Sequence, residues 1–389
     1  MARTPKLDED AAPLPEPDRV EGAPHPRETA HLYGQGNAEA AFLAAFNAGR
    51  MHHSWLLTGP EGLGKATLAW RIARFLLAAP AGDGGLFGAP PPPATLDVDP
   101  GDPVMRRVTA LSEPRLYLLR RGPNDKRTDL MSVISVDEVR RMKSFFTLSA
   151  ADGGRRVAII DAADDLNPNA ANALLKLLEE PPKDAVFLIV AHQPARLLPT
   201  IRSRCRALRL SPLNPADMAA ALAQAGVDVD DAGALAALAG GSVGAAIRLA
   251  QHDGLASYRG ILALAATLPR LDRPRMLALS DAAGRRGAAA VFDMTVTLVE
   301  LFLARLARQG ATATPAPEAA PGEAALFARL CPDAAAARGW ADLAQSLGAR
   351  VRQGRAVNLD PASLVLDMLL RLETGPAKRA FEGGRNDRR

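Results

Sequence analysis

Short apolar runs alternate with helical patterns in the first half of the chain. The runs typical of strands are 55–57, 116–119, 157–160 and 186–190. Between them apolar residues recur at helical spacing, and Ser135 with Glu138 forms a capping box that starts one helix. A second helix start is marked by Asn167 before Pro168. This alternation predicts an α/β domain over 31–211, in which helices cover a parallel sheet.

The second half of the chain has a different pattern. After Leu210 the sequence is rich in Ala and Leu at helical spacing, and it contains no run typical of a strand. Apolar residues share one helix face in 291–306 and again in 362–372, and the Ala/Pro-rich stretch 311–321 is expected to form the turn between them. We therefore expect two all-α domains, a small one over 212–254 and a larger one over 255–375.

Three segments lack this periodicity. Residues 1–30 are rich in Pro and acidic side chains, with a net charge of −3, and we expect a disordered leader. Residues 376–389 carry a net charge of +3 and are expected to form a disordered basic tail. The Gly- and Pro-rich stretch 80–104 interrupts the α/β pattern and is expected to be a flexible insertion.

Composition narrows the class of protein. The chain has 389 residues, 48% of them apolar and 23% charged, which fits several folded domains. Its net charge of +4 is too small for strong autonomous DNA binding, and basic residues are not interleaved with aromatic ones, which argues against a plain nucleic-acid-binding protein. No run of 18 apolar residues occurs, and the start has no apolar core segment. We expect a cytoplasmic protein without a membrane span.

The two cysteines, Cys205 and Cys331, limit the covalent and metal chemistry. They lie far apart in the chain and have no second pair. A disulfide framework and a four-cysteine zinc site are therefore excluded.

A glycine-rich loop follows the run 55–57 and precedes a helical pattern. Gly59, Gly62 and Gly64 would let backbone amides point at phosphate oxygens, and Lys65 would reach the outer phosphates. This strand, loop and helix order predicts a P-loop. The next position holds Ala66 where Ser or Thr would bind Mg²⁺.

Two further features of this site leave alternatives open. Thr67 has a hydroxyl, but it comes one residue late and should face another side of the helix. Asp161 ends an apolar strand where P-loop folds hold magnesium, but Ala162 replaces the glutamate that polarises the attacking water. Asp161 either binds a metal through water or caps the next turn. The loop either binds nucleotide weakly or is a retained turn.

Taken together, three segments resemble the AAA+ clamp-loader family of bacterial DNA polymerase III. These are GPEGLGKATLA at 59–69, IIDAADDLNPNAANALLKLLEEPP at 159–182 and LLPTIRSRC at 197–205. The resemblance implies a RecA-like P-loop domain, a helical lid over 212–254 and a helical collar for oligomerisation over 255–375. It also implies a five-subunit ring with delta and three tau or gamma subunits. The assembled ring is expected to contact the sliding clamp and primed DNA, and no contact with a membrane is expected.

In that family one end subunit places an SRC-motif arginine against ATP bound to its neighbour, which here is Arg204. Two sensor positions of the ATP-hydrolysing members also differ: His192 and Gln193 stand at the first, and Val243 follows Ser242 at the second. The resemblance therefore implies a non-hydrolysing stator, part of a polymerase holoenzyme but with no polymerase or robust ATPase activity of its own.

The expected cofactors follow from the same resemblance. None is required, ATP and Mg²⁺ bind weakly at most, and no metal is expected. Many relatives carry a zinc module where this chain has the insertion 80–104, but the insertion contains no cysteine. The alternative is an autonomous AAA+ ATPase of the tau/gamma or recombination-linked type.

Overall fold

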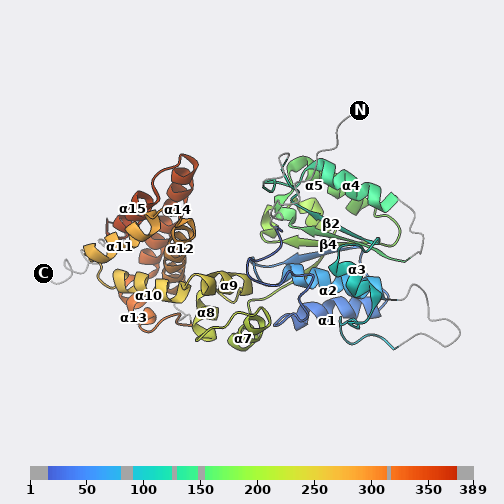
Figure 1. Cartoon of the computed structure of the whole chain (residues 1–389), viewed down its shortest axis with the longest axis horizontal. Coiled ribbons are helices and arrows are strands. Elements are labelled where there is room, and N and C mark those ends of the chain that lie inside the picture. The colour runs from blue at the N-terminus through green and yellow to red at the C-terminus, as the bar shows by residue number, and fades with distance from the viewer. Residues whose placement is uncertain (1–15, 80–90, 125–128, 148–153, 313–316, 375–389) are drawn as a thin grey trace. The chain divides into compact units, whose positions relative to one another are not determined.

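The chain divides into two compact units, with the boundary between Pro212 and Leu213 (Figure 1). The computed structural model describes residues 16–79, 91–124, 129–147, 154–312 and 317–374. The boundary falls where the α/β pattern was expected to end. The segments 212–254 and 255–375 belong to the same unit, so their separation into a lid and a collar stays a prediction. The predicted tail 376–389 lies outside the described residues.

The first unit contains a five-stranded parallel sheet in the order β2-β3-β4-β1-β5. The strands are β1 (Ser54–Thr58), β2 (Leu116–Arg120), β3 (Arg156–Asp161), β4 (Ala185–Ala191) and β5 (Arg206–Arg209). The predicted α/β fold is thereby confirmed, with β1 to β4 where the apolar runs lie. The edge strand β5 was not predicted, because two of its four residues are arginines and three of the four are exposed.

Helices cover both faces of this sheet (Figure 1). On one face lie α1 (Gly36–Asn47), α2 (Lys65–Ala78) and α3 (Pro103–Thr109), and on the other α4 (Val136–Thr147), α5 (Pro168–Glu179) and α6 (Pro199–Ser203). Two short 3-10 turns, η1 (Ala163–Asp165) and η2 (Pro194–Arg196), follow β3 and β4.

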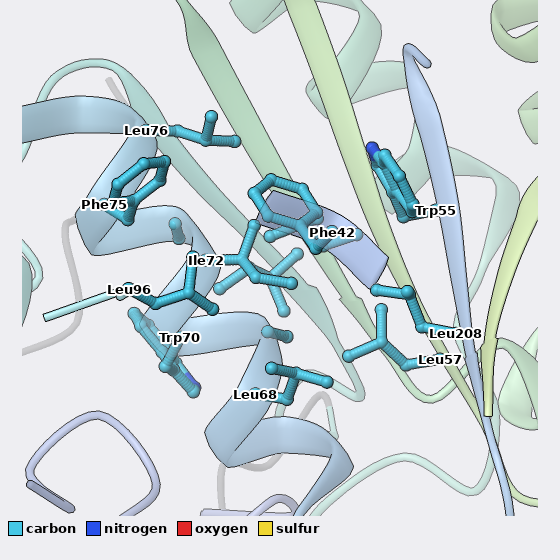
Figure 2. Close-up of a cluster of buried hydrophobic side chains, with 14 of the residues drawn as sticks. Phe42, Trp55, Leu57, Leu68, Trp70, Ile72, Phe75, Leu76, Leu96 and Leu208 are labelled. Atoms are coloured by element: carbon cyan, nitrogen blue, oxygen red, sulfur yellow. The ribbon is translucent and has the colours of Figure 1, made fainter. Parts of the chain in front are cut away.

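The core on the α1 and α2 side brings Phe42, Trp55 and Ile72 together (Figure 2). Side chains alternate along each strand, so Leu188 of β4 faces this core while Phe187 faces the core beneath α4 and α5. The strand-like runs are apolar on both faces because both faces are covered.

The predicted helix starts are confirmed. The Ser135 hydroxyl accepts a bond from the Glu138 amide at 3.4 Å, and the Asn167 side chain accepts from the Ala170 amide at 2.8 Å. Pro168 occupies the first turn of α5. Both caps satisfy amides that have no partner inside the helix.

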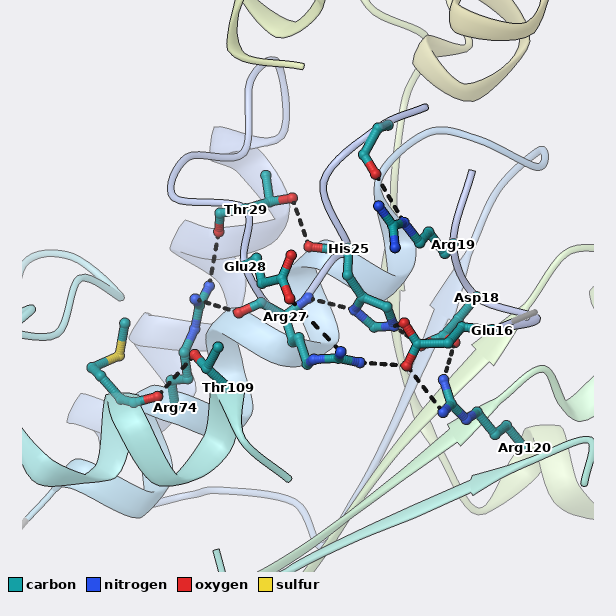
Figure 3. Close-up of polar contacts among 12 residues, drawn as sticks. Glu16, Asp18, Arg19, His25, Arg27, Glu28, Thr29, Arg74, Thr109 and Arg120 are labelled. Atoms are coloured by element: carbon teal, nitrogen blue, oxygen red, sulfur yellow. Dashed lines mark hydrogen bonds and ion pairs between the residues drawn. The ribbon is translucent and has the colours of Figure 1, made fainter. Parts of the chain in front are cut away.

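The leader predicted over 1–30 is wrong for residues 16–30, which fold against the first unit. The side chains of Asp18 and His25 are fully buried there (Figure 3). The acidic composition indicated a solvated chain, but Glu16 and Asp18 pair with Arg120 at 3.2 and 2.5 Å. These long-range partners are invisible to local composition. Residues 1–15 lie outside the described part of the chain.

The insertion predicted as flexible over 80–104 is also packed in its second part. Leu96 is 2% exposed and joins the core beneath α2. Asp97 pairs with Arg71 at 2.9 Å, and Asp102 caps α3 before Pro103. One buried leucine and one ion pair hold this proline-rich stretch. Residues 80–90 lie outside the described part.

In its described residues, the second unit consists of helices and the turns that connect them. They are α7 (Pro215–Gln224), α8 (Ala232–Leu238), α9 (Val243–Gln251), α10 (Gly254–Ala265), α11 (Arg273–Gly284), α12 (Ala289–Thr312), α13 (Glu323–Leu330), α14 (Ala334–Ala356) and α15 (Pro361–Thr374). The helical patterns 291–306 and 362–372 lie in α12 and α15. The stretch 311–321 does not join them directly, because α13 and α14 intervene. The alanine-rich α14 has little apolar contrast, which hid it in the sequence.

A buried ion pair ties several of these helices together. Arg305 of α12 contacts Glu323 of α13 at 2.7 Å, and the Tyr258 hydroxyl of α10 donates to the same carboxylate at 2.5 Å. Arg305 also donates to the carbonyl of Ala237 in α8 at 2.6 Å. The segments 212–254 and 255–375 are thus joined by buried polar contacts, which fits their place in one unit.

No single helix in the described ranges has the length and apolar character needed to cross a bilayer. The bent pair α8 and α9 meets that test by length and composition only.

Candidate functional site

The predicted P-loop lies between the end of β1 and the start of α2. Gly59, Gly62 and Gly64 all have positive φ, the region that favours glycine. Gly64 caps α2 with φ +88°, and a side chain there would meet Leu32 at 2.6 Å. The loop therefore has the backbone course that turns amides toward a phosphate.

Lys65 begins α2 and is bonded within its own loop. Its ammonium donates to the carbonyls of Gly59 at 2.7 Å and Pro60 at 2.5 Å, and the residue is only 3% exposed. Burial lowers the pKa of Lys65 to about 8, against the opposing charges of Asp161 and Glu61. The group expected to reach a phosphate is thus already satisfied by main-chain oxygens.

The two residues after Lys65 lie in the first turn of α2. Ala66 is half-buried and brings no oxygen, while Thr67 is buried in α2 with 9% exposure. Successive helix positions point about 100° apart, so Thr67 does not replace the missing hydroxyl.

Asp161 ends β3 and lies opposite Arg120, the last residue of β2. It is 7% exposed. Burial, followed by the negative charge of Asp18, raises the pKa of Asp161 to about 7, against the charge of Lys65. At neutral pH this carboxyl is therefore divided between its charged and neutral forms, which weakens it as a metal ligand.

Asp164 links the turn after β3 to the end of β4. Its carboxylate accepts bonds from the backbone amides of His192 at 2.6 Å and Gln193 at 2.8 Å. Burial, and after it the charge of Lys65, lower the pKa of His192. Nothing in the sequence indicates that Asp164 fixes the backbone after β4.

The carboxyl edge of the sheet thus brings Lys65 and Asp161 together, as a parallel α/β fold requires. Among the described residues, no group of three or more His, Cys, Asp or Glu side chains is arranged to hold a metal ion.

Arg204 occupies a separate position at the end of α6. Its guanidinium lies 2.9 Å from the carboxylate of Glu179 and donates to the carbonyl of Thr200 at 3.1 Å. About a third of its side chain is exposed. The described contacts hold the Arg204 guanidinium at the end of α5 and not in the P-loop.

The neighbouring arginines differ from Arg204. Arg202, Arg206 and Arg209 are exposed, and Arg206 stacks over the ring of Trp55 at 5.2 Å. Among these four arginines, the described contacts give an ion pair and a main-chain hydrogen bond to the guanidinium of Arg204.

Comparison with known proteins points to one family. A family model described as DNA polymerase III, delta subunit, matches residues 34–214. DNA polymerase III subunit delta' of Pseudomonas aeruginosa is 39% identical over 153 residues, which cover 39% of this chain and 41% of that protein. Subunit delta' of Escherichia coli is 33% identical over 245 residues, covering 61% and 66%.

A relative of another kind is also similar. DNA polymerase III subunit gamma/tau of Mycobacterium tuberculosis is 31% identical over 219 residues, covering 53% of this chain and 33% of that protein. The chain spans less than two thirds of the length of each of these three relatives.

The raised pKa of Asp161 predicts a pH-dependent stability change. The folded chain binds this proton up to about pH 7 and the unfolded chain only up to about 3.8, so the group's favourable contribution is lost as the pH rises through 7. Asp161→Asn should increase the free energy of unfolding by up to about 4 kcal/mol at pH 8 and by much less near pH 4. Urea unfolding at both pH values measures it.

Asp228→Asn, a change at an exposed carboxylate of the second unit, is the control. A stability difference for Asp161→Asn that is the same at both pH values would contradict the buried, half-protonated carboxyl.

Proposed function

Because the chain belongs to the delta prime family of DNA polymerase III clamp-loader subunits, we propose that it is a stator that does not hydrolyse ATP in its own site. Its partners are the delta and the tau or gamma subunits. It meets the sliding clamp and primed DNA through the assembled complex, in the cytoplasm. Its contribution to catalysis is made in trans, in a neighbouring subunit.

The lack of catalytic groups in its own site supports this role. Ala66 offers no hydroxyl to Mg²⁺, and Ala162 offers no carboxylate to a water. His192 and Val243 stand at the two sensor positions of the hydrolysing members. The internal bonding of Lys65 agrees, because phosphate binding would first have to break two hydrogen bonds. Three of these positions, Ala66, Ala162 and His192, follow or flank the carboxyl ends of strands in the first unit.

The position of Arg204 is the observation that carries the proposal. A guanidinium is planar and always charged, and its fixed donors match the oxygens of a phosphoryl group in transfer. Arg204 is partly exposed and held by Glu179 outside the chain's own P-loop. It is therefore suited to reach the ATP of an adjoining subunit.

The alternative function, an autonomous ATPase of the tau/gamma or recombination-linked type, is not favoured. Similarity to a gamma/tau subunit covers about half of the chain. This chain has a P-loop without its magnesium ligand at Ala66 and a strand end without its glutamate at Ala162.

The proposed role of Arg204 predicts a loss of activity without a loss of assembly. With Arg204→Ala in the reconstituted complex, single-turnover hydrolysis at the adjoining site should fall by roughly 10³-fold, because a trans arginine contributes about that factor. The complex should still elute as one species in size-exclusion chromatography. Arg202→Ala, two residues earlier and within α6, is the matched control.

If Arg204→Ala prevents assembly, the arginine is structural. Unchanged hydrolysis in an intact complex would remove it from the mechanism.

Glu179 is predicted to position Arg204. Glu179→Gln keeps the shape of the side chain but removes the charge that holds the guanidinium, so hydrolysis by the complex should fall several-fold. The same change should have no further effect in a chain that already carries Arg204→Ala, which a double-mutant cycle measures. Glu180→Gln, at the next and exposed position, controls for charge. Additive losses would show that Glu179 acts elsewhere.

A further inference from the structure

Residues 16–30, here called the N-terminal strap, lie along one side of α2 (Figure 3). Arg74 donates to the carbonyls of Arg27 and Thr29, each at 3.2 Å, and Arg71 donates to the carbonyl of Ala30 at 2.6 Å. Both arginines are nearly buried, at 5% and 7% exposure. The strap thus satisfies charged groups on a helix that is otherwise enclosed.

The other end of the strap reaches β2. Asp18 lies 2.5 Å from Arg120 and 3.1 Å from His25, and neither Asp18 nor His25 has an exposed side chain. Glu16 pairs with Arg27 at 2.6 Å (Figure 3). The ring of His25 meets Trp70 of α2 edge-on, with 6.0 Å between centroids. A buried charge cluster and an aromatic contact therefore fix this end.

This contact brings the strap to the nucleotide site. Arg120, which Asp18 binds, is the register partner of Asp161 across β2 and β3. Adjacent strands are about 5 Å apart, so Arg120 and Asp161 are close neighbours, and the negative charge of Asp18 acts on the Asp161 carboxyl. At the other end the chain runs from the strap to Leu32, which abuts Gly64, and to Gln35, which donates to the carbonyl of Ser211 at 2.8 Å.

We propose that the N-terminal strap occupies the carboxyl edge of β2 and β3 in cis and closes the degenerate P-loop against magnesium nucleotide. The strap brings the Asp18 carboxylate within electrostatic reach of Asp161, the carboxyl expected to face a magnesium ion. Asp161 is enclosed by Asp18 and Arg120. This proposal concerns nucleotide binding, which the strap would control. The missing catalytic groups concern only the hydrolysis of ATP.

Calorimetry with Mg·ADP and Mg·ATPγS on the full chain tests this. His25→Ala removes the contacts to Trp70 and Asp18, and Asp18→Asn removes the charge that Arg120 binds. Each change should release the strap and raise nucleotide affinity at least about tenfold. Adding Lys65→Ala should abolish the gain, because the gained binding is in the P-loop. Hydrogen exchange of the amides over 24–30 measures release independently of nucleotide.

Two controls separate the strap from other effects. Arg19→Ala changes an exposed side chain of the same segment, which donates a local hydrogen bond to the carbonyl of Ala23. Asp165→Asn removes a carboxylate from the same edge, where it pairs with Arg121 at 3.1 Å, without touching the strap. Neither should release the strap.

Faster exchange over 24–30 with unchanged nucleotide affinity would overturn the proposal. A gain equalled by Asp165→Asn would also overturn it, since charge alone would then suffice. If His25→Ala does not fold, as judged by a cooperative thermal transition, the isosteric Asp18→Asn decides the question. All of these measurements use the isolated chain, so they are independent of whether Arg204 acts in a complex.

Discussion

The bonds from the Lys65 ammonium to the carbonyls of Gly59 and Pro60 define the state of the whole carboxyl edge. A buried cation needs partners, and here main-chain oxygens provide them. Burial, and after it the negative charge of Asp18, raises the pKa of Asp161 to about 7, although the same lysine is a nearby positive charge. The P-loop backbone keeps its course while its charged groups are satisfied internally.

This internal satisfaction separates two roles that a single ATPase would combine. The chain's own site has lost the groups that bind magnesium and direct water, at Ala66 and Ala162. Arg204 keeps a fixed, partly exposed guanidinium on a different helix, where Glu179 orients it. In the role that we propose, the chain gives a neighbouring subunit an electrostatic group while its own site stays inactive.

Much of this could be predicted from the sequence. The strands β1 to β4 follow from apolar runs, and α4 and α5 from their caps at Ser135 and Asn167. The strand β5 could not be predicted, because an edge strand with exposed arginines has no apolar run. Asp164 escaped notice because its role depends on amides 28 and 29 residues away. The strap was missed for the same reason.

We propose that this chain does not hydrolyse ATP in its own site, and steady-state ATP turnover by the purified full chain is the most direct test. The native chain and Lys65→Ala are compared at saturating Mg·ATP, alone and with primed DNA. We expect the same background rate of ATP hydrolysis for both chains under both conditions. Turnover by the native chain that Lys65→Ala abolishes would contradict it.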